Sequence, residues 1–106
     1  MSFSNTPRRI SARQAKVLIR QNPSAIIVDV RTRQEYSRMH IPGAILLPKD
    51  TIQTHAYRTL PDKNAPIFVH CKSGGRSREA ANTLANMGYT NVYDFGGIDS
   101  WPYETE

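Results

Sequence analysis

Residues 25–30 read Ala-Ile-Ile-Val-Asp-Val, and this almost continuous apolar run limits the possible folds more than any other feature of the chain. A run rich in β-branched side chains suits a strand that is buried on both faces, as strands of parallel sheets are. A second apolar run covers residues 67–70, and shorter runs at 44–48 and 91–95 are candidates for two further strands. The chain is therefore predicted to build a mostly parallel sheet.

Helical patterns lie between these strand candidates. Ser11 and Gln14 have the spacing of a capping box, in which two side chains satisfy free N–H groups at the start of a helix. An apolar stripe at helical spacing follows over residues 15–21. The other predicted helices cover residues 32–39, 51–57 and 77–87, and Gly88 fits the end of the last one. Alternating strands and helices with short connections predict an α/β layered fold with about five strands.

Length and composition indicate one globular domain. With 106 residues, 39% of them hydrophobic and 22% charged, the chain is expected to form a soluble domain over residues 1–106, with residues 1–7 as a flexible N-terminus. The chain ends five residues after Trp101, so we expect no second domain. No apolar stretch approaches the roughly 18 residues of a membrane span, and the N-terminus lacks the apolar core of a secretory signal. A single cysteine cannot form an internal disulfide, which indicates a reducing compartment such as the cytoplasm.

The formal net charge of +5 would attract an anionic substrate or partner, although a basic solvated surface is the simpler explanation of the charge alone. Lysines and arginines are spread along the chain, and the chain has no nucleic-acid-binding motif. We therefore expect no nucleic-acid partner and no membrane partner.

Cys71 is the only cysteine, and it stands where an apolar run ends and a short loop begins. In parallel α/β sheets, ligands gather at the carboxyl ends of the strands. Gly74 and Gly75 allow the backbone to curl so that several N–H groups converge near the start of the next helix, which favours a bound anion or a thiolate. A buried core cysteine is the alternative, but the glycine pair and the cations Lys72 and Arg76 favour a reactive thiol.

Four segments together resemble the rhodanese-like domain family of sulfurtransferases. They read Asp-Val-Arg at 29–31 with Glu-Tyr at 35–36, His-Ile-Pro-Gly-Ala at 40–44, Cys-Lys-Ser-Gly-Gly-Arg-Ser at 71–77, and Gly-Gly-Ile at 96–98 with Trp101. The resemblance implies a single rhodanese-like domain, in which a parallel five-stranded sheet carries helices on both faces. It also implies that Cys71 is the residue that carries sulfur.

The chemistry of a lone thiolate agrees with this role. Cys71 would attack the outer sulfur of thiosulfate or of a persulfide donor, hold it as a persulfide and pass it to a thiophilic acceptor such as cyanide. Such an enzyme, a sulfurtransferase of the thiosulfate type, needs neither a metal nor an organic cofactor. The alternative is a non-enzymatic sulfur-carrier or adaptor module that receives sulfur from a protein partner. Lys72 and Arg76 favour the enzyme, because a small dianionic donor needs cations.

Two related chemistries are disfavoured. Disulfide exchange needs a resolving cysteine, and the chain has no second cysteine. Phosphatases and arsenate reductases of similar appearance separate their cysteine and arginine by five residues, whereas four residues separate Cys71 from Arg76. The shorter loop is better sized for a sulfane sulfur than for a phosphate.

The expected substrate-binding residues are Lys72, Ser73, Gly74, Gly75, Arg76, Ser77 and Arg31. Lys72 and Arg76 are expected to bind the oxyanion end of the donor. The alternatives for them are a solvated loop tip and a pair with a carboxylate. Ser77 is expected to be the N-cap of the helix that follows the loop.

A polar cluster is expected near the rim of the site. Arg31 is spaced to pair with Glu35 and is also able to meet Asp29, so its main role is read as structural, with direct substrate contact as the second option. His70 is next to Cys71, but alternate residues of a strand point to opposite faces. His70 is therefore a poor candidate for a general base.

Overall fold

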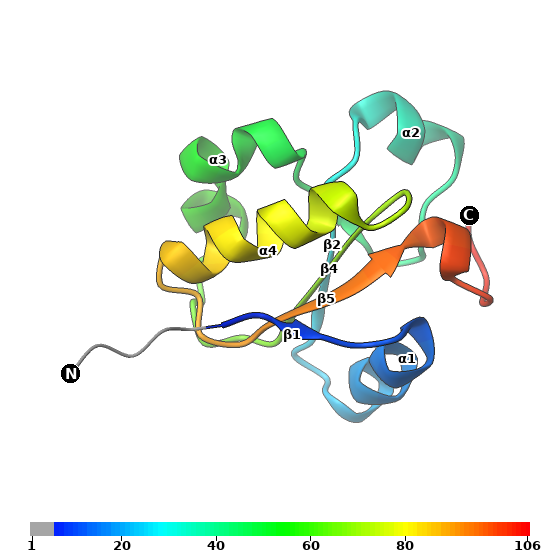
Figure 1. Ribbon diagram of the computed structural model, residues 1–106, viewed down its shortest axis with the longest axis horizontal. Coiled ribbons are helices and arrows are strands. Elements are labelled where there is room, and N and C mark those ends of the chain that lie inside the picture. The colour runs from blue at the N-terminus through cyan, green and yellow to red at the C-terminus, as the bar shows by residue number, and fades with distance from the viewer. Residues whose placement is uncertain (1–5) are drawn as a thin grey trace.

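The computed structural model describes residues 6–106, which form one five-stranded sheet with helices on both of its faces (Figure 1). The strands are β1 (Arg8–Arg9), β2 (Ile26–Asp29), β3 (Ile45–Leu46), β4 (Ile67–Cys71) and β5 (Val92–Gly97). The α-helices are α1 (Ala12–Gln21), α2 (Arg33–Arg38), α3 (Ile52–Thr59) and α4 (Gly75–Asn86), and the 3₁₀ helices are η1 (Lys49–Thr51) and η2 (Ile98–Ser100). Neighbouring strands are all parallel, which confirms the predicted α/β fold.

The strand that ends in the cysteine is the central one. The strand order is β1-β5-β4-β2-β3, and all five residues of β4 are buried. Val69 lies opposite Val28 of β2 on one side and opposite Asp94 of β5 on the other. Because β4 has a neighbour on each side, its carboxyl end is enclosed by the ends of β2 and β5. Cys71 is therefore placed in the middle of the edge where ligands of parallel sheets bind.

Two hydrophobic clusters fill the space between the sheet and its helices. Val69 packs on the α3 and α4 side, in a cluster that includes Leu84, while Phe68 packs on the α1 side with Ala15. Figure 1 shows α1 below the sheet and α3 and α4 above it. Because side chains along a strand point alternately to its two faces, successive residues pack on opposite sides of the sheet, as expected for a strand that is buried on both faces.

Strand β1 was not predicted from the sequence. Its two residues are arginines, which give no apolar strand pattern, yet Arg8 and Arg9 lie in register with Tyr93 and Asp94 at the edge of the sheet. The N–H of Ile10 extends the pairing by donating to the carbonyl of Asp94 at 3.0 Å. Most of the expected flexible N-terminus, residues 1–7, lies outside the described residues.

The capping prediction for the first helix is confirmed. Ser11 Oγ accepts the N–H of Gln14, and the Gln14 side chain accepts the N–H of Ser11. The helix predicted at 51–57 is present as α3, preceded by η1. None of the helices within residues 6–106 is both long enough and apolar enough to span a membrane.

The predicted start of α4 is wrong by two residues, and Ser77 is not its N-cap. The cap is Gly74, whose backbone is left-handed with φ of +118°. Only glycine adopts this conformation at little cost, so the glycine starts the helix earlier than a serine cap would. Ser77 lies in the first turn of α4 instead, where it is fully buried.

Candidate active site

The thiol of Cys71 is buried against the first turn of α4. Its side chain is 1% exposed, and the N–H of Gly74 donates to Sγ at 3.0 Å. Since the first N–H groups of a helix have no partner within it and carry part of the helix dipole, this contact places positive potential at the sulfur. The predicted convergence of loop amides on Cys71 is present for Gly74.

The loop after Cys71 is held against the end of β5 by close backbone contact. Cys71 lies opposite Gly97 after an irregularity in the β4–β5 register. A Cβ atom on Gly97 would overlap the carbonyl oxygen of Lys72, so only glycine fits at this position. The N–H of Asp99, in η2, donates to the same Lys72 carbonyl at 3.1 Å. The path of the loop is thus fixed by two contacts from the end of β5.

Arg76 is held by a carboxylate from another element. Its guanidinium donates to both oxygens of Glu35, at 2.7 and 2.9 Å, and joins α4 to α2. These hydrogen bonds are the largest cause that lowers the pKa of Glu35 from 4.5 to about 2. Glu35 therefore stays ionised across the neutral range. The expected pair of Arg31 with Glu35 is not formed, because Arg76 occupies that carboxylate.

Arg31 is paired with Asp29, as the sequence allowed. Its Nη2 lies 2.7 Å from Asp29 Oδ2, and the same nitrogen donates to the Met39 carbonyl at 2.7 Å. Arg31 is 4% exposed and Asp29 is fully buried, so this pair is almost completely buried. Arg31 thereby fixes the chain after α2 to the end of β2.

Lys72 lies at the loop surface. Its ammonium group is 3.0 Å from Asp99 Oδ2, and both side chains are about half exposed. Ser73 and Gly75 are also exposed on this loop. An exposed ion pair of this kind is weak and opens readily. Lys72 can therefore leave Asp99 for another anion at small cost.

Ser77 holds the start of α4 against β5. Its hydroxyl donates to Asp94 Oδ1 at 2.8 Å and lies 3.1 Å from the Gly74 carbonyl and 3.3 Å from that of Gly96. Asp94 Oδ1 also accepts the N–H of Gly96 at 2.9 Å. Ser77 thus links the start of α4, and with it the glycine that touches the thiol, to β5.

A pocket of about 260 Å³ lies next to Lys72, the first residue of the loop after Cys71, and Cys71 is not among its lining residues. It is lined by Arg31, Glu35, Arg38, Met39, Lys72, Ile98 and Asp99. The structure thus brings Arg31 and Lys72 to one cavity, together with the carboxylate that holds Arg76. We call this cavity the mouth pocket.

His70 lies on the other side of the strand from the thiol, as predicted. Its ring is fully buried and packs at 5.2 Å from the ring of Phe95, in the α1-side cluster. Its Nδ1 is 3.1 Å from the Cys71 carbonyl oxygen. Burial lowers the pKa of His70, so the ring is neutral near pH 7. No group of three His, Cys, Asp or Glu side chains within residues 6–106 is arranged to hold a metal ion.

A sequence model of the rhodanese-like domain matches residues 11–103 of this chain. The chain belongs to the rhodanese-like family. A relative of this rhodanese-like chain, thiosulfate sulfurtransferase PspE of Escherichia coli K12, is 37% identical over 67% of the chain and 68% of the relative. Thiosulfate sulfurtransferase GlpE of Ectopseudomonas mendocina is 39% identical over 89% of the chain and 84% of the relative.

Solved structures agree with the family. A rhodanese with anions from E. coli is 32% identical, has a TM-score of 0.73, and is matched over 77% of this chain and 96% of that one. The Alr3790 protein from Anabaena is 28% identical with a TM-score of 0.83, over 92% and 90% of the two chains. The rhodanese-like fold and the family, both predicted from the sequence, are therefore confirmed.

Three residues near the rhodanese loop were missed as site residues by the sequence analysis. Arg38 and Met39 line the mouth pocket, and Arg38 forms no ion pair within residues 6–106. Gly97 is where the loop touches β5. The signal for Gly97 was its place in the Gly-Gly-Ile segment, whereas an exposed arginine at the end of a short helix carries no signal of its own.

Proposed function

We propose that this rhodanese-like domain is a sulfurtransferase that moves a sulfane sulfur from thiosulfate or a persulfide donor to a thiophilic acceptor such as cyanide. The observation that carries the proposal is the 3.0 Å contact between the Gly74 N–H and Cys71 Sγ at the carboxyl end of the central strand. A sulfur anion at this place is stabilised by the N-terminus of α4. The family relatives named thiosulfate sulfurtransferases support the same reaction class.

The first half-reaction forms a persulfide. The Cys71 thiolate attacks the outer sulfur of thiosulfate, a new S–S bond forms, and the S–S bond of thiosulfate breaks. Sulfite leaves with the electron pair of that bond. In the second half-reaction, cyanide attacks the outer sulfur of the persulfide, thiocyanate leaves, and the electron pair returns to Cys71 as thiolate. Each half-reaction is a displacement at sulfur, so the kinetics are expected to be ping-pong.

The cations at the loop have different roles in this proposal. Lys72, whose partner Asp99 is half exposed, is the loop cation most available to a donor dianion. Arg31 and Arg76 are paired with Asp29 and Glu35, so their main role is to hold the surroundings of the loop in place. Arg38, exposed at the rim, supplies a further cation for the donor. Ser73, Gly75 and Ser77 shape the loop that receives the sulfur.

A steady-state assay with thiosulfate and cyanide tests the enzyme proposal. Thiocyanate is expected from the wild-type protein and not from Cys71→Ala. Lys72→Ala is expected to raise KM for thiosulfate by about tenfold, because one cation next to a dianion is lost. Lys63→Ala, which removes a lysine that caps the end of α4 near Met87, is the matched control and should leave KM unchanged. Thiocyanate formation by Cys71→Ala at the wild-type rate would contradict the proposal.

A sulfur-carrier role is the second candidate. The adenylyltransferase and sulfurtransferase UBA4 of Candida albicans is 35% identical over 88% of this chain, which spans 23% of that protein. A rhodanese-like region is there part of a larger sulfur-handling protein, so delivery by protein contact is an option for this domain too. A carrier would accept one sulfur on Cys71 from a protein persulfide donor but turn over thiosulfate and cyanide no faster than the alanine variant. A reducing compartment such as the cytoplasm suits either role, because the thiol must stay free.

A further inference from the structure

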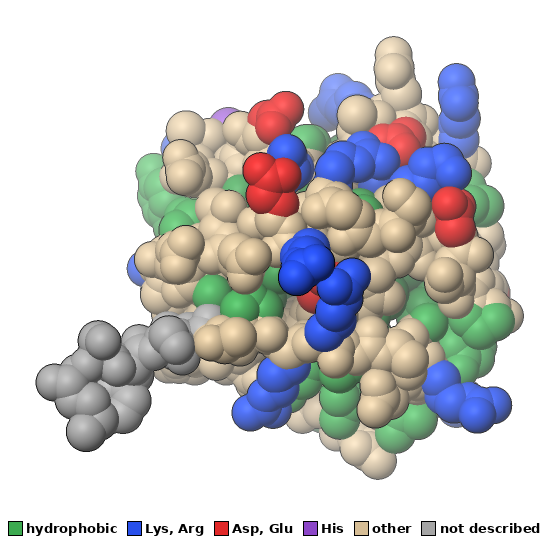
Figure 2. Space-filling view, in the orientation of Figure 1, with side chains coloured by type: hydrophobic (Ala, Val, Ile, Leu, Met, Phe, Trp, Pro, Cys, Tyr) green, Lys and Arg blue, Asp and Glu red, His purple; other side chains and the backbone are tan. Residues whose placement is uncertain are grey.

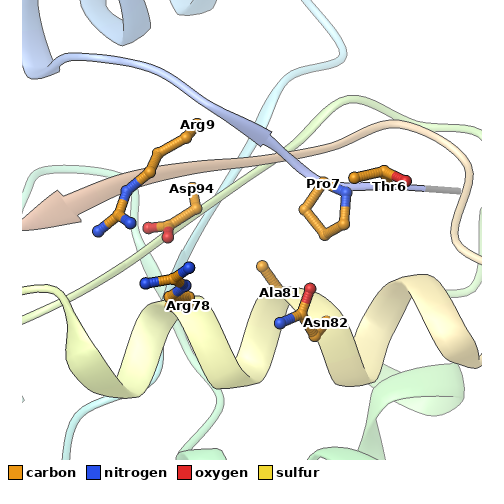
Figure 3. A pocket seen from close by; sticks show the side chains of 7 residues that line it. All are labelled: Thr6, Pro7, Arg9, Arg78, Ala81, Asn82 and Asp94. Atoms are coloured by element: carbon orange, nitrogen blue, oxygen red, sulfur yellow. The ribbon is translucent and has the colours of Figure 1, made fainter.

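A second pocket lies between α4 and the part of the sheet formed by β1 and β5. Its volume is about 220 Å³, and its lining residues are Thr6, Pro7, Arg9, Arg78, Ala81, Asn82 and Asp94 (Figure 3). They come from β1 and the two residues before it, from β5 and from α4. None of them lines the mouth pocket, so the two cavities are separate. Figure 2 shows Lys or Arg side chains gathered over this part of the surface.

Asp94 gives this pocket an unsatisfied hydrogen-bond acceptor. The side chain is 3% exposed, and its Oδ1 accepts from Ser77 Oγ and from the N–H of Gly96. Its other oxygen, Oδ2, is buried and has no hydrogen-bond partner within the described residues. A buried carboxylate oxygen without a donor is costly. A molecule in the pocket that donates a hydrogen bond to Oδ2 would remove the cost of burying this oxygen without a partner.

Two cations face the same space. In Figure 3 the guanidinium groups of Arg9 and Arg78 point toward each other and toward the Asp94 carboxylate. Neither forms a hydrogen bond or ion pair through its side chain within residues 6–106. Asn82, one helical turn after Arg78 on α4, places its amide on the same side. Two guanidinium groups and one carboxylate leave the pocket with a net positive charge.

These groups define the ligand. Two guanidinium groups require an oxyanion, and Asp94 Oδ2 requires that the oxyanion still carries a proton. We propose that this pocket binds a small protonated oxyanion of the phosphate type, whose P–O–H donates to Asp94 Oδ2 while its other oxygens accept from Arg9 and Arg78. Inorganic phosphate keeps at least one proton near pH 7, whereas sulfate and thiosulfate keep none. The pocket is therefore not a second site for the sulfur donor.

Calorimetric titration of the full chain with phosphate and with sulfate, at matched ionic strength, tests the proposal. Phosphate is expected to bind about tenfold tighter than sulfate, because sulfate would place a lone pair against Asp94 Oδ2. Equal affinity for the two anions, or no phosphate binding, would overturn the proposal. An absence of phosphate binding would result if Arg9 or Arg78 forms an ion pair with Asp94 in solution.

Asp94→Asn tests the role of the proton. Oδ1 must remain the acceptor for Ser77 and Gly96, so the amide NH₂ takes the place of Oδ2 and donates to either anion. The preference for phosphate over sulfate should disappear. A variant that folds, as circular dichroism would show, and keeps the full preference would contradict the assignment.

Charge variants locate the site even if Asp94→Asn does not fold. Arg78→Gln is expected to weaken phosphate binding at least about tenfold. Arg8→Gln is the matched control, because Arg8 points to the other side of β1, onto the Tyr93 ring and hydroxyl, and its loss should leave binding unchanged. Cys71→Ser should also bind phosphate normally, which separates this pocket from the active-site loop and from the sulfurtransferase proposal. Phosphate binding that is lost in Cys71→Ser but kept in Arg78→Gln would overturn the proposal.

Discussion

At the scale of single residues, each cation next to Cys71 is already matched with a carboxylate. Arg76 pairs with Glu35, Lys72 with Asp99, and the buried Arg31 lies 2.7 Å from Asp29. Arg31 and Arg76 cost little to organise when a substrate arrives, because their geometry is set before binding, whereas the exposed pair of Lys72 opens readily. Because their partners largely cancel these charges, the positive potential at the thiol comes mainly from the Gly74 N–H and the start of α4.

The pair of Glu35 with Arg76 makes stability depend on pH. The folded-state pKa of Glu35 is about 2, below the ordinary value of 4.5, so its contribution is present above pH 4.5 and is lost as pH falls toward 2. Glu35→Gln is expected to lower the free energy of unfolding by about 1–2 kcal/mol at pH 7, after allowance for solvent screening. Urea denaturation at several pH values measures this.

The difference between Glu35→Gln and the wild type should shrink between pH 5 and pH 2. Glu79→Gln is the matched control, because Glu79 pairs with Lys49 while 68% exposed, and it should change stability little at any pH. A Glu35→Gln effect that stays the same down to pH 2 would show that the ion pair does not carry it.

At the scale of elements, the close contact between the Cys71 loop and β5 allows only glycine at position 97. Gly97→Ala places a Cβ against the Lys72 carbonyl, so the backbone of the loop has to move. A loss of roughly 1–3 kcal/mol in the free energy of unfolding is expected, and urea denaturation measures it.

Gly75→Ala is the matched control for the Gly97 variant. A Cβ there meets no atom within 4 Å, and Gly75 is not among the glycines with positive φ. Its stability should be unchanged or about 0.4–1 kcal/mol higher, since alanine favours the helix. If Gly75→Ala destabilises the domain as strongly as Gly97→Ala, the crowding argument is wrong.

The link from α4 to β5 through Ser77 gives a second prediction for elements. Ser77→Ala removes the hydroxyl that donates to the buried Asp94 and should cost about 1–2 kcal/mol in thermal or urea unfolding. Ser73→Ala, on the exposed loop tip, should cost much less. Equal effects of the two substitutions would mean that the Ser77 hydrogen bond adds nothing to stability.

At the scale of the whole molecule, local patterns predicted the layers but not the long-range pairs. The buried runs gave β2 and β4, and the capping box of Ser11 gave the start of α1, because these depend on neighbours in sequence. Strand β1 was missed because Arg8 and Arg9 are strand residues only through their pairing with β5. No local pattern marks a pairing between residues that lie more than eighty positions apart.

In the active site, too, the sequence showed the local features but not the long-range contacts. The position of Cys71 at a strand end and the glycines of its loop were visible in the sequence, since the cysteine follows an apolar run. The partner of Arg76 was not visible, because Glu35 lies 41 residues away and local spacing favoured a pair with Arg31. The cap of α4 was placed wrongly because a left-handed Gly74 competes with Ser77, and propensity alone ranks serine first.

The whole account depends on Cys71 as the atom that receives sulfur. Mass spectrometry of the intact protein after thiosulfate treatment tests this most directly. The account predicts a mass increase of one sulfur atom, located by peptide mapping on Cys71, removed by cyanide and absent from Cys71→Ser. A wild-type protein that gains no sulfur from thiosulfate or from a persulfide donor, or one that gains it equally as Cys71→Ser, would contradict the account.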